Sequence, residues 1–404
     1  MLGCFDSKTE DFNYLHSCLT SLGVKVLSLN TGVFEAHTSF PIDISAEETA
    51  QQAGISLVDL RSKNDRGLVV EKMGEGSFQI IAQLIAAHKI DAAIGMGGGG
   101  GTYIALSAMQ SIPIGIPKVC LSTVATKDLS RQVGTKDIVL VPSIVDVAGL
   151  NKISSILIAQ AAGAVVGMMN APSVQDTAVK GTIAISMFGN TTACVQECTR
   201  LLKEEGYEVL AFHAVGSGGK AMENLIHEGF FDGVLDLTTT ELADDLCDGI
   251  CSAGPDRLTA AAHMGIPQVV APGCLDMVNY GHLDTVPKRF QSRQLYSWAP
   301  DVTLMRTNEA ENRTLGNSLA NKVNASKGKA RLLIPLQGIS IVSSKGGVFH
   351  APETDRILFE SIKSSLRPDI PVEELDVEIN DPVFAKRAVD RLLEMLDVPK
   401  RQET

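Results

Sequence analysis

The chain has 404 residues, of which 45% are hydrophobic and 20% charged, and this balance excludes an intrinsically disordered protein. Its formal net charge is −12 and only 5% of its residues are aromatic, so we expect no nucleic-acid partner. Its length predicts two domains. The eight cysteines are too few for a disulfide framework and no signal-peptide pattern opens the chain. We therefore expect a cytoplasmic protein with reduced thiols and no membrane partner.

Short apolar runs typical of strands alternate with helical patterns along the first part of the chain. Only residues 2–5 precede the first turn, so the opening strand is expected to be short. The predicted strands span residues 24–29, 92–96, 118–122 and 138–141, and the predicted helices span residues 10–22, 67–88, 102–109 and 152–169. The apolar stretch 156–171 is too short for a membrane span and is interpreted as a buried helix.

The periodicity lapses over residues 170–180, which we interpret as a linker, and then begins again. Further strands are predicted at residues 182–187, 208–212, 233–236, 268–271 and 331–335, with helices at 193–205, 220–227, 256–263, 309–325, 353–365 and 382–396. Such alternation is typical of parallel α/β proteins. The sequence therefore predicts two doubly wound, Rossmann-like parallel-sheet domains, residues 1–175 and 176–404, with a cleft between them.

The strongest local signal is a run of five glycines, Gly97 to Gly101, between a predicted strand and a predicted helix. Glycine costs conformational entropy, and a simple turn needs only one or two of them. Consecutive glycines allow backbone amides to converge at a helix N-terminus, where the helix dipole favours an anion. A cradle for phosphate or carboxylate is the favoured interpretation, and a flexible structural loop is the alternative.

A second glycine loop, Gly216 to Gly219, also lies between a strand and a helix but fits neither the P-loop nor the dinucleotide fingerprint. Anion binding and a structural turn both remain open for it. His213 precedes this loop at a strand end, where ligand sites of α/β proteins form, although a single histidine is often structural.

Other predicted strand ends carry polar side chains that either line a cleft or cap helices. Asp276 is a candidate base or metal ligand, with turn stabilisation as the alternative. Arg306 ends a predicted strand at 302–305 and is expected to contact an anionic ligand.

Taken in order, these motifs resemble the Tm-one-like ATP-binding family, which is uncharacterised protein family 0261. The motifs that carry the resemblance are the Gly97–Gly101 loop and residues 111–119, 122–125, 188–192, 212–219, 275–281 and 304–307. The family includes the N-terminal module of the tomato mosaic virus resistance protein. The resemblance implies a two-domain α/β protein that binds ATP and forms a homodimer. The family's Asp-Thr-Lys turn appears here in altered form as Asp6-Ser7-Lys8.

We therefore expect an ATP-binding protein, in the leading interpretation an enzyme of small-molecule metabolism, with ATP and optionally Mg²⁺ in the cleft. A protein-interaction module that holds ATP structurally, and a lyase or hydrolase acting on an acidic metabolite, are the alternatives. His213, Asp276 and Arg306 are the candidates for catalysis, and no metal site of the protein itself is predicted. The expected cofactor-binding residues are Gly97, Gly98, Gly99, Gly100, Gly101, Thr102, Ser122, Thr123, Thr191, Gly216, Gly218, Gly219 and Asn279.

Overall fold

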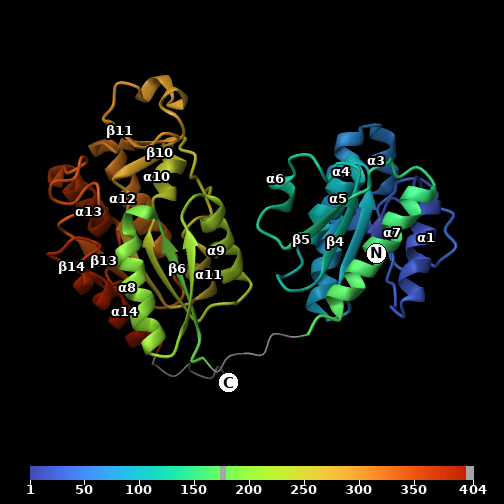
Figure 1. The fold of residues 1–404 in the computed structure, drawn as a ribbon, viewed down its shortest axis with the longest axis horizontal. Coiled ribbons are helices and arrows are strands. Elements are labelled where there is room, and N and C mark those ends of the chain that lie inside the picture. Colours follow the sequence, from blue (N-terminus) through green and yellow to red (C-terminus); the bar gives the residue numbers. More distant parts are fainter. Residues whose placement is uncertain (173–178, 397–404) are drawn as a thin grey trace. The chain divides into compact units, whose positions relative to one another are not determined.

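The computed structural model describes residues 1–172 and 179–396. The chain forms two compact units, Met1–Gln175 and Asp176–Thr404 (Figure 1). Each unit contains a parallel sheet whose strands alternate with helices, so the predicted fold class is confirmed. The predicted linker at residues 170–180 lies in part outside the described residues.

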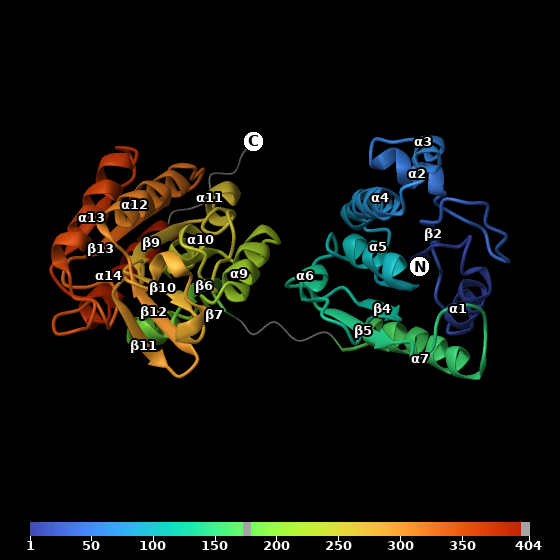
Figure 2. The ribbon, with the colours of Figure 1, turned by 90° about the horizontal axis from the view of Figure 1, so that it is seen from above.

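The first unit is built on a five-stranded parallel sheet in the order β2-β1-β3-β4-β5. Its strands are β1 (Leu2–Gly3), β2 (Leu29–Asn30), β3 (Ala93–Gly97), β4 (Lys118–Ser122) and β5 (Ile138–Pro142). Its helices are α1 (Thr9–Ser21), α2 (Ala46–Gln52), α3 (Leu57–Lys63), α4 (Arg66–Ala86), α5 (Gly99–Met109), α6 (Ser130–Val133) and α7 (Lys152–Met169). Figure 2 shows α1 and α7 on one side of this sheet and α4 and α5 on the other.

Successive side chains of β3 point into different cores, as the period of two of a strand requires. Ile94 and Met96 pack with α1 and α7, whereas Ala93 packs with α4 and α5. Gly95 lies where α5 approaches the sheet most closely, because a Cβ there would lie 2.6 Å from Cβ of Ala105. This contact fixes α5 on β3 and places its first turn at the carboxyl edge of the sheet.

Two elements of the first unit differ from expectation. Within the predicted strand 24–29 only Leu29 joins the sheet, because the backbone N–H of Ser28 donates to the Asp43 carboxylate instead of a neighbouring strand. Helix α7, expected to be buried, is buried along one face only, and Ile153 and Ile156 on its other face are 45% and 50% exposed. By length and composition alone α7 is the one described helix that passes the test for a membrane span, although here it packs beside α1 on the sheet.

The second unit is built on a six-stranded parallel sheet in the order β14-β13-β9-β8-β6-β7. Its strands are β6 (Thr182–Met187), β7 (Glu208–His213), β8 (Gly233–Thr238), β9 (Gln268–Gly273), β13 (Ala330–Pro335) and β14 (Val372–Leu375). Its main helices are α8 (Thr192–Glu204), α9 (Ser217–His227), α10 (Glu241–Leu246), α11 (Ala260–Met264), α12 (Glu309–Asn324), α13 (Pro352–Ser365) and α14 (Pro382–Leu396). Helices α8 and α14 pack against one face of the sheet, and α12 and α13 pack against the other.

A small antiparallel sheet in the second unit was not predicted. It consists of β10 (Met277–Tyr280), β12 (Val302–Arg306) and β11 (Leu295–Ala299) in that order. The strand predicted at residues 302–305 is therefore β12, which belongs to this separate sheet. The expectation for Arg306 treated this run as a strand of the parallel sheet, and β12 is antiparallel to both of its neighbours. The contact of Arg306 with an anionic ligand stays a prediction.

Each unit has hydrophobic cores of its own. The buried clusters that contain Phe12, Ile81 and Met73 draw only on residues of the first unit. Those that contain Leu319, Leu392 and Met222 draw only on the second. The apolar burial that stabilises one unit therefore does not depend on the other.

We predict that residues 1–172 and 179–396, produced as separate chains, each fold cooperatively. Circular dichroism should show a sigmoidal thermal transition for each fragment, at a temperature close to one of the transitions of the full chain. A fragment that lacks such a transition would contradict this independence.

Candidate functional site

Each parallel sheet has one point at which the chain reverses the direction in which strands are added. In the first unit β1 is followed by β2 on one side and by β3 on the other, so the reversal lies between β1 and β3. In the second unit it lies between β6 and β8. Ligands of open α/β sheets bind outside the carboxyl ends of the strands at such a point.

A pocket of about 370 Å³ lies at the reversal point of the first unit. Its walls include Gly97, Gly98, Gly100 and Gly101 of the glycine run and the segments that follow β1 and β2. Lys8 and Arg66 bring two cations to it, and neither has an ion-pair partner among the described residues. Asp6 and Asp146 line the same pocket, and Asp6 accepts a hydrogen bond of 2.9 Å from the backbone N–H of Phe34.

Gly97 ends β3, and Gly99 to Gly101 form the first turn of α5, where the sequence suggested a loop ahead of the helix. Gly98 is the N-cap residue, and the N–H of Thr102 donates to its carbonyl at 2.8 Å. The amides of Gly99, Gly100 and Gly101 belong to the first turn, where helical amides lack an intrahelical acceptor. They have no other acceptor in the part of the chain that the structure describes. The turn therefore presents three unpaired donors.

The fold itself does not explain why so many of these residues are glycine. A Cβ at Gly97 would lie 2.8 Å from Cα of Gly101, so packing requires that glycine. A Cβ at Gly99 would meet nothing within 4 Å, and at Gly98 and Gly101 the nearest atoms would be 3.7 and 3.6 Å away. None of the five has a positive φ. Glycine at these positions weakens the helix by roughly 0.5–1 kcal/mol each relative to alanine, while it keeps the amides accessible.

Three hydroxyl residues predicted to bind the ligand lie next to this turn. Thr102 and Ser122 are buried and share a hydrogen bond of 2.7 Å, and the hydroxyl of Thr102 also donates to the carbonyl of Gly97. The N–H of Thr123 donates to the same carbonyl, and its hydroxyl lies beside Gly98. Thr102 and Ser122 thus support the glycine turn through the carbonyl of Gly97. Their hydroxyls already form a hydrogen bond with each other.

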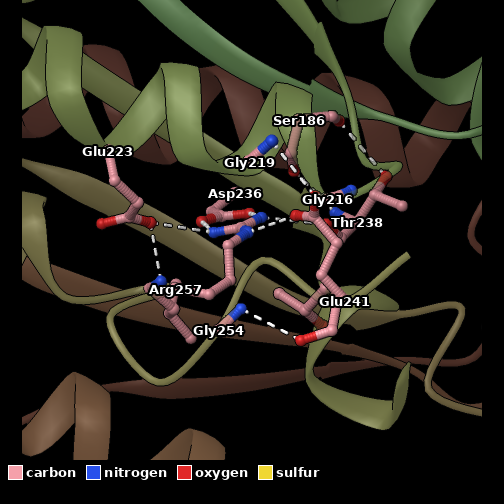
Figure 3. Close-up of polar contacts among 12 residues, drawn as sticks. Ser186, Gly216, Gly219, Glu223, Asp236, Thr238, Glu241, Gly254 and Arg257 are labelled. Atoms are coloured by element: carbon pink, nitrogen blue, oxygen red, sulfur yellow. Dashed lines mark hydrogen bonds and ion pairs between the residues drawn. The ribbon is translucent and has the colours of Figure 1, made fainter. Parts of the chain in front are cut away.

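The second glycine loop already holds an anion that belongs to the chain (Figure 3). The N–H groups of Gly216 and Gly219 donate to Oε1 of Glu241 at 2.7 and 3.1 Å. The fold requires these glycines: Gly216 has φ +84°, and a Cβ at Gly218 would lie 1.9 Å from the carbonyl oxygen of His213. The Glu241 carboxylate therefore occupies the place where an external anion would contact these amides.

Glu241 belongs to a buried ionic cluster that the sequence analysis missed. The fully buried guanidinium of Arg257 contacts Glu241, Asp236 and Glu223, with an Nη2–Oδ1 distance of 2.6 Å to Asp236 (Figure 3). Glu223 also accepts hydrogen bonds from three backbone N–H groups of residues 258–260, at the start of α11. The one signal in the sequence was Asp236, a charged residue inside the apolar run of β8.

The remaining predicted residues of the second unit have partners within the protein. The hydroxyl of Thr191 shares a hydrogen bond of 2.8 Å with that of Thr238, which joins the segment after β6 to the end of β8. His213 is exposed at the end of β7, with its ring 5.5 Å from that of Phe188. The side-chain amide of Asn279 donates to Asp244 and Thr240.

Asp276 and Arg306 lie together in the interior of the second unit. Arg306 uses all five of its N–H donors on Asp355, Thr307 and the carbonyls of residues 276, 349 and 351. Asp276 accepts a hydrogen bond from the Ser340 hydroxyl at 2.8 Å, and burial raises the pKa of its carboxyl to about 6. No group of three or more potential metal-ligating His, Cys, Asp or Glu side chains occurs among the described residues.

Comparison with known proteins supports a relationship over both units. The description "Uncharacterised protein family (UPF0261) N-terminal domain" matches residues 1–174, and the corresponding C-terminal domain matches residues 180–396. A UPF0261 protein of Clostridium tetani is 42% identical over 98% of each chain, and one of Rhizobium meliloti is 39% identical over 96% of each. The ToMV resistance protein Tm-1(GCR237) of Solanum lycopersicum is 34% identical over 98% of this chain and 55% of its own length. The family resemblance is thereby confirmed.

We predict that Arg257→Met destabilises the second unit by about 3–5 kcal/mol, because three buried carboxylates lose their shared cation. Urea unfolding followed by circular dichroism measures the change. Arg200→Met is the matched control, because Arg200 forms exposed ion pairs with Glu197 and Glu204 on α8 and its loss should leave the unfolding transition in place. Equal effects of the two substitutions would contradict a structural role for the cluster.

A second prediction concerns Asp244, which accepts hydrogen bonds from the backbone and side chain of Asn279 and whose pKa is raised by burial to about 7. In the unfolded chain this carboxyl ionises near its ordinary value, so the folded state binds the extra proton between about pH 4 and pH 7. Stability therefore falls as the pH rises through this window, by on the order of 2 kcal/mol between pH 5 and pH 8.

Asp244→Asn should remove this part of the pH dependence of urea unfolding. The variant is expected to fold, because the Oδ1 atom of Asn279 has no partner and can accept from the new amide after a side-chain flip. An unchanged difference in stability between pH 5 and pH 8 would show that Asp244 does not take up the proton.

Proposed function

The chain belongs to the uncharacterised protein family UPF0261, and within that family we propose that it is an ATP-binding protein whose phosphate site is the pocket at Gly97–Gly101. The observation that carries the proposal is the set of glycines at positions 98, 99 and 101, which neither packing nor a positive φ requires. A ligand that must approach the backbone closely accounts for them. Phosphate is such a ligand, because it is an anion of many acceptors at the positive end of a helix.

The charges around the pocket favour the same ligand. The protein carries a net charge of −12, so long-range attraction does not recruit ATP and local donors must bind it. Lys8 and Arg66 supply two cations beside the unpaired amides of α5. If Mg²⁺ accompanies the triphosphate, Asp6 and Asp146 are the carboxylates that would hold it, since Mg²⁺ is commonly bound by one or two carboxylates together with phosphate oxygens.

The second glycine loop supports this choice by contrast. There the same kind of loop receives a carboxylate from Glu241, and each of its glycines discussed above is required by the fold. An external phosphate at Gly216–Gly219 would have to displace a side chain that also binds Arg257. We therefore assign ATP to the first loop and a structural role to the second.

We predict that Gly99→Val abolishes ATP binding, because a branched side chain in the first turn of α5 would obstruct the approach of a phosphate to the unpaired amides. Since a Cβ at Gly99 meets nothing within 4 Å, the melting temperature of the ligand-free protein should move by only a few degrees. Calorimetric titration with MgATP measures the affinity. Thermal unfolding gives a second readout, because a ligand at 100 times its dissociation constant adds about 2.7 kcal/mol of stability.

The matched control is Gly163→Val on α7, which also lies in a helix and whose Cβ would meet nothing within 4 Å. This variant should bind ATP like the unaltered protein. Unchanged ATP affinity in folded Gly99→Val would rule the first loop out. Release of inorganic phosphate, measured on the same samples, separates an enzyme from a protein that holds ATP without turnover.

A further inference from the structure

An open groove along α4 and α5 adjoins the pocket at the glycine turn. Arg66, Val70 and Gly100 line both the pocket and the adjoining space of about 580 Å³. Glu71 and Tyr103 line this space and also the next one, of about 560 Å³, which extends to Phe78. The groove therefore adjoins the proposed phosphate site and extends away from it along the two helices.

Tyr103 is the aromatic side chain closest to the glycine turn in this groove. It follows Gly100 by three residues, so its ring lies about one helical turn, roughly 5 Å, beyond the unpaired amides. The side chain is 40% exposed. Its inner edge rests on α4 at Gly74, where a Cβ would lie 3.4 Å from Cε1 of the ring. The ring is thus supported on one side by backbone and open on the other.

The charges change sign along the groove. Lys8 and Arg66 line the pocket at the glycine turn, Glu71 lines both spaces beside Tyr103, and Glu75 lines the space farther from the turn. Glu75 is paired with Lys72 at 2.7 Å, and Glu71 has no ion pair among the described residues. A second anionic group would be repelled there. A neutral group with hydrogen-bond donors fits instead, and a nucleotide has such a group next to its phosphates.

We propose that this groove binds the nucleoside part of the ligand, with the base stacked on the Tyr103 ring and the Glu71 carboxylate accepting from the ribose hydroxyls. This inference rests on the proposed ATP site. Stacking on an aromatic ring contributes to binding for every base, because each base has a π-face. The groove therefore selects a nucleoside triphosphate over inorganic polyphosphate.

The test compares MgATP with magnesium tripolyphosphate, an inorganic probe that has the same phosphate chain and no nucleoside. Both are titrated calorimetrically into the full chain and into Tyr103→Ala, Tyr103→Leu and Tyr103→Phe. Tyr296→Ala in the second unit, at a similarly exposed tyrosine, is the matched control. Tyr103→Leu keeps most of the packing against Gly74 and guards against a loss that comes from folding alone.

We expect Tyr103→Ala and Tyr103→Leu to weaken ATP binding by about 5- to 150-fold, as the loss of one base stack predicts, and to leave the affinity for tripolyphosphate unchanged. Tyr103→Phe and Tyr296→Ala should bind ATP normally. Unchanged ATP affinity in folded Tyr103→Ala, or an equal loss for both probes, would overturn the inference. If tripolyphosphate binds the unaltered protein as tightly as ATP, the nucleoside site is wrong and the phosphate site stands. If neither ATP nor tripolyphosphate binds, both the nucleoside site and the proposed function are wrong.

Discussion

The arrangement of both units depends on one constraint, which is that the first amides of a helix need acceptors from outside the helix. A parallel sheet places the start of each following helix at the carboxyl edge of the strands, so these donors collect at one edge of the unit. In the second unit Glu241 and Glu223 supply the acceptors at the starts of α9 and α11. At α5 of the first unit no described side chain does so. The amides at the starts of α9 and α11 are thus paired within the protein, whereas those at the start of α5 are unpaired among the described residues.

The backbone N–H donors also explain how three carboxylates are tolerated around one buried guanidinium. Buried charge is costly unless every lone pair has a donor. Glu223 receives three backbone N–H groups and Glu241 receives two, so backbone dipoles supply the stabilisation that a second cation would otherwise have to give. The cluster joins β8 to α9, α10 and the segment before α11, and it fixes how these elements meet at the edge of the sheet.

Strong periodicity was enough to predict several elements at their observed bounds, including α7 (Lys152–Met169) and β6 (Thr182–Met187). The start of α5 was missed because glycine is a poor helix former, and the helix begins at Gly99 through the packing of Gly95 against Ala105. Strand β12 was foreseen as a strand, but an apolar run does not reveal whether its neighbours are parallel. The contact of Glu241 with Gly219 joins residues 22 positions apart, and no local pattern indicates it.

The two-residue strand β1 occupies a central place in the first sheet, between β2 and β3. Its ladder has only the pairs Leu2–Leu29, Gly3–Asn30 and Leu2–Gly95. The turn that follows it carries Asp6 and Lys8 into the wall of the pocket. Few ladder pairs therefore hold β1, so local opening of β1 and β2 costs less than opening of the five-residue strands β3 and β4. A ligand that contacts both this turn and α5 joins the two elements across the pocket. Binding of that ligand then slows the hydrogen exchange of backbone amides in the middle of the first sheet.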